Sequence, residues 1–291
     1  MFKGTTTALI TPFTNDKVDF EKLEQLIEFQ IQNHIDGLLI CGTTGEPATM
    51  TYSEREEVIK FAIKKINHRI PVMVGTGSNC TRIAIDNTIN AEKFGADAAL
   101  VVTPYYNKCT QNGLIEHYNA IANRTSLPIL VYNVPGRTGV NILPETAAKL
   151  AENKSLIGLK EACGKLDQIE KTAKAIQGSQ LKLYSGDDGL AIDIMKLGAN
   201  GLISVASNII PQQTHDMIQS FIDGNTTYSQ SIFDKYKELF STLFVEVNPI
   251  PVKYAAFKLG LCNNELRLPL TPIENKNAQI VDRVLKELKI I

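Results

Sequence analysis

The chain has 291 residues, 44% of them hydrophobic, and 30 lysines and arginines against 31 aspartates and glutamates give a formal net charge of −1. This near-neutral balance argues against a nucleic-acid-binding protein, which would carry a basic stripe. No apolar run approaches the roughly 18–20 residues of a membrane span, and the N-terminus lacks the apolar stretch of a signal peptide. We therefore expect a cytoplasmic protein with no membrane partner.

The five cysteines and four histidines are spread widely along the chain. They form no C-x-x-C, H-x-x-x-H or H-E-x-x-H motif, so the pattern favours neither a disulfide framework nor a zinc site. We expect them to fill core and surface positions, and we expect no metal in the protein.

Short apolar segments rich in valine, isoleucine and leucine indicate strands buried on both faces, as in parallel sheets. We place eight such strands at residues 7–10, 37–41, 71–75, 98–103, 129–133, 156–160, 181–185 and 201–204.

Segments with helical spacing lie between these strands. Asp19 is expected to cap the first helix, and Gly95 is expected to end the third. Ser53 and Glu56 have the spacing of a capping box that opens the second helix. Further helices are expected at residues 113–122, 144–151, 166–177, 188–196, 211–223, 226–246, 252–261 and 278–288.

Strand and helix thus alternate eight times, which matches a (β/α)8 barrel. An open doubly wound sheet usually has fewer strands and often a glycine fingerprint after the first one, but Thr11-Pro12-Phe13 follows it here. We expect an α/β fold, a (β/α)8 TIM barrel over residues 1–224, and a C-terminal helical region over residues 225–291.

Lys160 is the most informative single residue, because it ends the apolar strand at 156–160. Active sites of such barrels lie at the carboxyl ends of the strands. Burial lowers a lysine pKa from its usual value of about 10.4, and a neutral amine can form a Schiff base with a ketone. The alternative is a lysine held in a salt bridge inside the barrel.

Hydroxyl-bearing residues also follow other strands. Tyr132 ends the strand next to that of Lys160, and Thr43 and Tyr106 follow the second and fourth strands. A phenol held by hydrogen bonds can relay the protons that Schiff-base formation requires. For each residue alone, simple packing is the alternative.

Two further features indicate anion binding. The segment Gly42-Thr43-Thr44-Gly45 can present backbone N–H groups and hydroxyls to a carboxylate. Arg137, in a glycine-flanked loop, offers a planar guanidinium to a second carboxylate, although a surface salt bridge is its alternative. These strand ends suggest two small carboxylated substrates, one of them held as an imine.

Together these motifs strongly resemble the dihydrodipicolinate synthase family, which belongs to the pyruvate-dependent class I aldolases and is related to N-acetylneuraminate lyase. The resemblance covers essentially the whole chain. It is carried by GTTGE at 42–46, YNVPGRTG at 132–139, the isolated Lys160, YYN at 105–107, SGD at 185–187 and NPIPVK at 248–253.

The resemblance implies that pyruvate condenses with L-aspartate 4-semialdehyde to give 4-hydroxy-tetrahydrodipicolinate, in lysine and diaminopimelate biosynthesis, without a cofactor. Lys160 would form the imine with pyruvate. Tyr132, Thr43 and Tyr106 would form the proton relay, with Tyr106 reaching in from the adjacent subunit. The family is usually a homotetramer built as a dimer of dimers.

The resemblance also implies the substrate contacts. Thr44 and the backbone around it would bind the pyruvate carboxylate, and Arg137 would receive the carboxylate of the semialdehyde. Gly186 and Ile203 would line the site through their backbones.

Other functions stay open on the sequence. N-acetylneuraminate lyase shares the barrel, the lysine and the tyrosine, but its members resemble Gly-Ser-Thr-Gly-Glu at the first loop and lack the Gly-Arg-Thr-Gly signature. Arg137 is therefore the discriminating residue, also against other pyruvate-dependent 2-keto acid aldolases. A catalytically silent barrel used for binding or regulation would not need Lys160, Tyr132 and Thr43 intact.

Lysine-inhibited bacterial members of the family bind lysine at a subunit interface. The matching stretches here contain Pro47, Tyr52, Arg55, Asn79 and Ile83. Inhibited enzymes tend to have histidines near the positions of Tyr52 and Arg55, and an acid where Ile83 stands. An apolar side chain cannot pair with the lysine ammonium, so we expect weak or absent feedback inhibition.

Overall fold

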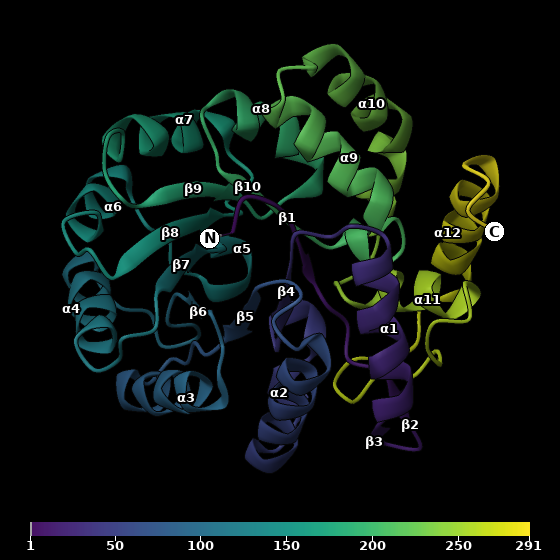
Figure 1. Cartoon of the computed structure of the whole chain (residues 1–291), viewed down its shortest axis with the longest axis horizontal. Helices are drawn as coiled ribbons and strands as arrows, with labels where there is room; N and C mark the ends of the chain where they lie inside the picture. Colours follow the sequence, from purple (N-terminus) through teal and green to yellow (C-terminus); the bar gives the residue numbers. More distant parts are fainter. Residues whose placement is uncertain (1) are drawn as a thin grey trace. The chain divides into compact units, whose positions relative to one another are not determined.

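The structure is a computed structural model that describes residues 2–291. Eight parallel strands form a closed barrel in the order β1, β10, β9, β8, β7, β6, β5, β4 (Figure 1). Helices lie between the strands along the chain and continue after the last one, so the expected fold class is confirmed. The barrel strands are β1 (Gly4–Ala8), β4 (Gly37–Ile40), β5 (Val72–Gly75), β6 (Ala98–Val102), β7 (Ile129–Asn133), β8 (Leu156–Glu161), β9 (Lys182–Ser185) and β10 (Gly201–Ser204).

The chain divides into two compact units. The first unit contains Pro71–Ile203, and the second contains Phe2–Ile70 together with Ser204–Ile291. This division by packing does not test the boundary expected between residues 224 and 225, which stays a prediction.

In the first unit, strands β5 to β10 each pair in parallel with the next one. Every residue of β7 is buried, which explains why its sequence is apolar without alternation. Figure 1 shows helices on the outer side of these strands. The helices of this unit are α3 (Thr81–Phe94), α4 (Gln111–Ala122), α5 (Pro135–Thr138), α6 (Pro144–Leu150), α7 (Leu166–Ala175), the short η3 (Asp188–Leu190) and α8 (Ala191–Lys196).

In the second unit, β1 pairs in parallel with β4, and helix α9 packs against both β1 and α10. Helix α12 packs against α10 and α11. The helices of this unit are α1 (Phe20–Gln32), η1 (Thr43–Gly45), η2 (Pro47–Thr49), α2 (Tyr52–Ile66), η4 (Ala206–Asn208), α9 (Pro211–Ile222), α10 (Thr226–Thr242), α11 (Ile250–Lys258) and α12 (Asn275–Glu287).

The first strand lies three residues nearer the N-terminus than expected. It runs over Gly4–Ala8, so three threonines rather than the apolar residues 8–10 form its centre. All five residues are buried, and the hydroxyls find acceptors: Thr5 Oγ1 donates to the Thr214 carbonyl at 3.0 Å, and Thr7 Oγ1 to Gln30 Oε1 at 2.6 Å. Threonine is β-branched and suits a strand once its hydroxyl is satisfied.

The capping box of α2 is formed by Thr51 and Glu54, and the expected pair Ser53 and Glu56 is wrong. The Thr51 hydroxyl accepts the Glu54 backbone N–H at 3.2 Å, and a Glu54 carboxylate oxygen accepts the Thr51 N–H at 2.8 Å. Arg267 holds Glu54 in place with a second bond to the same carboxylate, at 2.6 Å. Both pairs have the right spacing, but only Glu54 has this distant partner.

A small antiparallel hairpin of β2 (Phe13–Thr14) and β3 (Lys17–Val18) was not expected from the sequence. Its two turn residues, Asn15 and Asp16, have φ angles of 53° and 60°. Two residues with a left-handed backbone between two short strands are typical of a tight hairpin turn. The Asn-Asp dipeptide is the sequence feature that could have predicted this turn.

Candidate active site

The ends of β7 and β8 bring Tyr132 and Lys160 together. The two residues are direct partners in the parallel ladder, and the Lys160 Nζ lies 4.2 Å from the centre of the Tyr132 ring. Both side chains are buried, with Lys160 5% exposed and Tyr132 6%. The juxtaposition expected from the sequence is therefore present.

The pKa of Lys160 is lowered to about 7. Burial is the main cause, because it disfavours the charged ammonium; the Asp188 carboxylate acts in the opposite direction, and the Arg137 guanidinium lowers the pKa further. A lysine with such a pKa is substantially neutral near pH 7, and the neutral amine is the nucleophilic form.

Gly186 lies directly against the Lys160 side chain. A Cβ added at Gly186 would stand 2.7 Å from Lys160 Cε and 3.0 Å from Cγ, closer than atoms can pack without movement. The Gly186 N–H donates to the Glu161 carbonyl at 2.8 Å, which fixes this backbone to β8. Only glycine leaves room for the lysine here. Ile203, the other expected lining residue, is buried in β10.

Next to this pair, on the opposite faces of the same strands, lie Asn133 and Glu161, which sequence reasoning missed. They too are ladder partners, and both are fully buried. Asn133 Nδ2 donates to Glu161 Oε1 at 3.0 Å and to Asn141 Oδ1 at 3.0 Å, while Asn133 Oδ1 accepts the Ile142 N–H at 3.0 Å. Burial raises the pKa of Glu161.

Hydrogen bonds from this outward pair hold the segment that carries Arg137. Asn133 precedes the short helix α5, and its side chain bonds to Asn141 and Ile142 on the far side of that helix. Arg137 itself is exposed and belongs to α5. Side chains alternate between the two faces of a strand, so a polar residue that directly follows an inward-facing site residue must face the surrounding helices. This alternation could have predicted the positions of Asn133 and Glu161.

Tyr106 differs from the other expected residues of this unit. Its side chain is 90% exposed, and its φ angle is +70°. A left-handed backbone is uncommon for a bulky residue. Tyr106 lies between β6 and α4.

The second unit contains Thr43 and Thr44 in the short helix η1. Thr43 is exposed, whereas Thr44 is 2% exposed. Asn248 Nδ2 donates to the Thr44 hydroxyl at 3.0 Å, and Thr11 Oγ1 donates to the Gly45 carbonyl at 2.8 Å. The loop is thus held by side chains from distant parts of the chain, of which Asn248 and Thr11 were not expected.

Residues 2–291 contain neither a metal-binding cluster nor a membrane-spanning helix. No group of three or more histidine, cysteine, aspartate or glutamate side chains is arranged to hold a metal ion. No helix in this range has the length and apolar character required to cross a membrane.

A (β/α)8 barrel with a buried lysine of lowered pKa at a strand end is suited to the chemistry of Schiff-base-forming lyases. The model of the Dihydrodipicolinate synthetase family matches residues 1–288. The chain belongs to this family.

Relatives and solved structures agree over the full length. The chain is 50% identical over 291 residues to the 4-hydroxy-tetrahydrodipicolinate synthase of Alkaliphilus oremlandii, covering 100% of both chains. The structure of dihydrodipicolinate synthase from Thermotoga maritima matches with a TM-score of 0.98 at 44% identity, covering 100% of both. The chloride-inhibited enzyme from Acinetobacter baumannii, solved with pyruvate, matches with a TM-score of 0.97 at 42% identity, again over 100% of both.

Proposed function

We propose that this chain condenses pyruvate with L-aspartate 4-semialdehyde to give 4-hydroxy-tetrahydrodipicolinate, a step of lysine and diaminopimelate biosynthesis, in the cytoplasm. The observation that carries the proposal is Lys160, a buried amine with a pKa of about 7 beside Tyr132. The names of full-length relatives at 46–50% identity support it, as does the related structure that contains pyruvate.

The chemistry follows from the amine. Neutral Lys160 adds to the pyruvate ketone, water leaves, and a protonated imine forms. This imine withdraws electrons, so the pyruvate methyl group loses a proton and becomes the nucleophilic carbon of an enamine. That carbon attacks the semialdehyde carbonyl, which takes up a proton. The amino group of the second substrate then displaces Lys160 by ring closure, which returns the free lysine without metal or cofactor.

The proton transfers are assigned to Tyr132, Thr43 and Tyr106, with Tyr106 supplied by the adjacent subunit of a homotetramer. The short approach of the Tyr132 ring to Lys160 supports the first assignment. The 90% exposure of Tyr106 is compatible with a side chain that reaches toward another copy of the chain. A phenol in this relay need only pass protons between the reacting atoms and solvent.

The substrate carboxylates are assigned to Thr44 and Arg137. The Thr44 hydroxyl already accepts a hydrogen bond from Asn248, so its own hydrogen can point toward the pyruvate carboxylate. The exposed Arg137 guanidinium matches the carboxylate of the semialdehyde in a two-bond fork. Gly186 and Ile203 are assigned to the lining of the site through their backbones.

Borohydride reduction in the presence of pyruvate tests this function. We expect a stable adduct on Lys160, located by peptide mass mapping, because borohydride reduces the imine to a secondary amine. The Lys160→Ala variant and a sample without pyruvate are the controls. An adduct at another lysine, or none, rejects the mechanism.

A further inference from the structure

We propose that the buried ion pair between Glu46 and Lys253 positions the loop that carries Thr43 and Thr44, which makes Lys253 on helix α11 a positioning residue for pyruvate binding. This inference rests on the proposed function, in which the same loop binds the pyruvate carboxylate. Neither Glu46 nor Lys253 has a role in the reaction steps above.

The pair is fully enclosed. Lys253 Nζ lies 2.6 Å from Glu46 Oε1, and both side chains are 0% exposed. Burial lowers the pKa of Lys253, while the Glu46 carboxylate opposes that shift. Ion pairs at this depth lose most of their hydration, and apolar residues of similar volume often stabilise a fold as well or better. A purely stabilising role is therefore a weak explanation for the pair.

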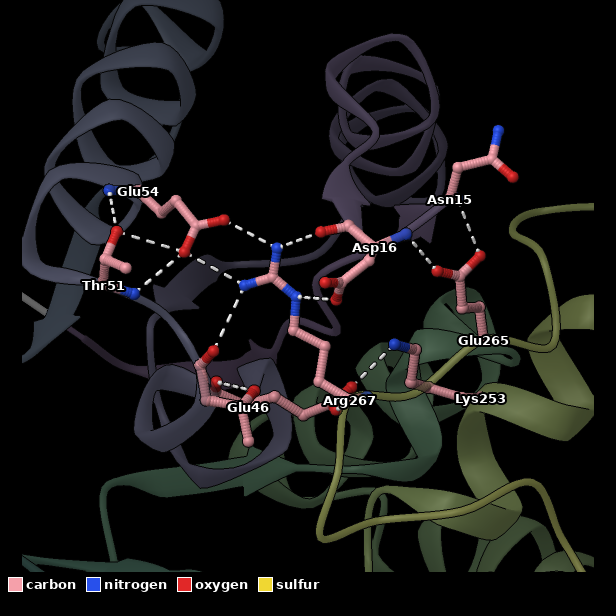
Figure 2. Close-up of polar contacts among 9 residues, drawn as sticks. Asn15, Asp16, Glu46, Thr51, Glu54, Lys253, Glu265 and Arg267 are labelled. Atoms are coloured by element: carbon pink, nitrogen blue, oxygen red, sulfur yellow. Dashed lines mark hydrogen bonds and ion pairs between the residues drawn. The ribbon is translucent and has the colours of Figure 1, made fainter.

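Figure 2 shows the polar contacts around the pair. The Arg267 backbone N–H donates to the second Glu46 oxygen at 3.4 Å, and the Arg267 guanidinium bonds to Glu54 at 2.6 and 3.0 Å. The ring of Phe13 lies 4.3 Å from Lys253 Nζ and 4.5 Å from the Arg267 guanidinium carbon. Both distances are within the range of cation–π attraction, so the cations are fixed by the same ring.

The backbone of Glu46 indicates why its side chain matters. Its φ angle is +54° and its ψ angle 40°, a left-handed conformation that glycine adopts without steric cost and a long side chain does not. Glu46 joins the short helices η1 and η2: its N–H donates to the Thr43 carbonyl at 3.2 Å, and its carbonyl accepts the Thr49 N–H at 3.2 Å. A glycine could satisfy this turn, but it would have no carboxylate to anchor.

The anchor acts on the proposed substrate contacts directly. Thr43, Thr44, Gly45 and Glu46 are consecutive, and each of the last three is held by a side chain from elsewhere in the unit. Asn248 bonds to the Thr44 hydroxyl, Thr11 bonds to the Gly45 carbonyl, and Lys253 bonds to the Glu46 carboxylate. Of these three side chains only Lys253 is charged, and hydrogen bonds between charged groups are stronger than neutral ones.

Three variants separate positioning from stability: Glu46→Met, Lys253→Met and the double variant. Each single change leaves one buried polar partner unmatched, so we expect a lower Tm and a smaller folded fraction. The double change removes both charges, so Tm should largely recover. The KM for pyruvate should remain raised by about tenfold or more in the double variant, because the loop has lost its anchor.

The measurements are Tm, KM for pyruvate, and borohydride trapping of pyruvate on Lys160. Lys258→Met is the matched control, since Lys258 lies on the same helix and pairs with Asp282 at the surface; its pyruvate KM should equal that of the parent. A double variant that regains both Tm and the parent pyruvate KM overturns the positioning role. A parent protein that traps no pyruvate on Lys160 rejects the proposed function instead, so the two failures are distinguishable.

Discussion

Two buried lysines in this chain have opposite surroundings. Lys160 faces the ring of Tyr132, and its pKa is lowered to about 7. Lys253 is in contact with a carboxylate at 2.6 Å, which favours its charged form against burial. Burial alone therefore does not make a lysine nucleophilic. Burial lowers the pKa of both lysines, but Lys160 lies at the carboxyl end of a barrel strand, where active sites of this fold are found.

The Asp188 carboxylate should control the pH dependence of imine formation. It raises the pKa of Lys160 against the effect of burial, so its removal in Asp188→Asn lowers that pKa further. Because the neutral amine reacts, the rate of imine formation with pyruvate rises with pH through the lysine pKa. We expect the rise near pH 7 in the parent and at a lower pH in the variant.

Borohydride trapping after short reaction times, measured from pH 5 to 9, gives this profile. Asp193→Asn is the control, because Asp193 lies nearby in sequence but forms an exposed pair with Lys196. A shift of the Asp188→Asn profile to higher pH would contradict the assigned direction.

At the scale of elements, the proposed function assigns the choice of the second substrate to Arg137 on the one-turn helix α5. It begins at Pro135, whose fixed φ suits a first helical position, and Gly139 caps its C-terminus with a φ of +73°. Thr138 is buried, accepts a hydrogen bond from Thr103 at 3.0 Å and so secures the turn. The exposed Arg137 is thus presented from a rigid turn.

Arg137→Ala should impair use of the semialdehyde more than imine formation. A lost bidentate contact to a carboxylate costs about 1.5–3 kcal/mol, which corresponds to roughly a ten- to hundredfold fall in kcat/KM for the semialdehyde. Arg137 also lowers the pKa of Lys160, so the imine profile should move to slightly higher pH. Steady-state kinetics and trapping measure the two effects, with Arg124→Ala as a surface control. Equal loss of both activities would remove the reason to prefer a synthase over a sugar-acid lyase.

Elements of the barrel could be read from the sequence where burial on both faces produced continuous apolar runs. For β7 the expected and observed bounds, residues 129–133, coincide. For β1 the apolar signal was misleading, because buried threonines with distant acceptors take the strand. The capping box failed for the same kind of reason, since Arg267 selects Glu54 from more than two hundred residues away.

The site residues also fall into those that the sequence could predict and those that it could not. Lys160 and Tyr132 could be predicted because strand ends concentrate chemistry, and their ladder pairing follows from adjacent strands. The Glu46–Lys253 pair could not, because its members are 207 residues apart and neither carries a local signal of burial. A charged residue reads as solvated until its partner is known.

For the whole molecule, we predict weak or absent inhibition by lysine. Tyr52 is 62% exposed, and the Arg55 guanidinium lies 5.8 Å from its ring centre, so a cation stands beside this position. Ile83 supplies no acid to meet the lysine ammonium. Activity should therefore be unchanged when lysine is titrated from micromolar to millimolar concentrations.

Ile83→Glu tests the reason as well as the result. If the missing acid is the cause, this variant should gain some sensitivity to lysine while its activity without lysine stays at the parent level. Sub-millimolar inhibition of the parent would show that another group meets the ammonium. Asn79→Ala is a suitable control, because Asn79 bonds to the Tyr105 carbonyl and offers no charge.

The paired ends of β7 and β8 separate two kinds of residue by a single step along each strand. Under the proposed function Tyr132 and Lys160 act on the reacting atoms, while the Asn133 side chain, one residue further, bonds to Glu161 and to Asn141 beyond α5. An engineer who wishes the barrel to accept a different aldehyde could therefore vary position 137, with the pKa of Lys160 measured in each variant because Arg137 lowers it. Asn133 and Glu161 would still hold the segment that carries position 137. New specificities could therefore be screened without changing the rest of the barrel.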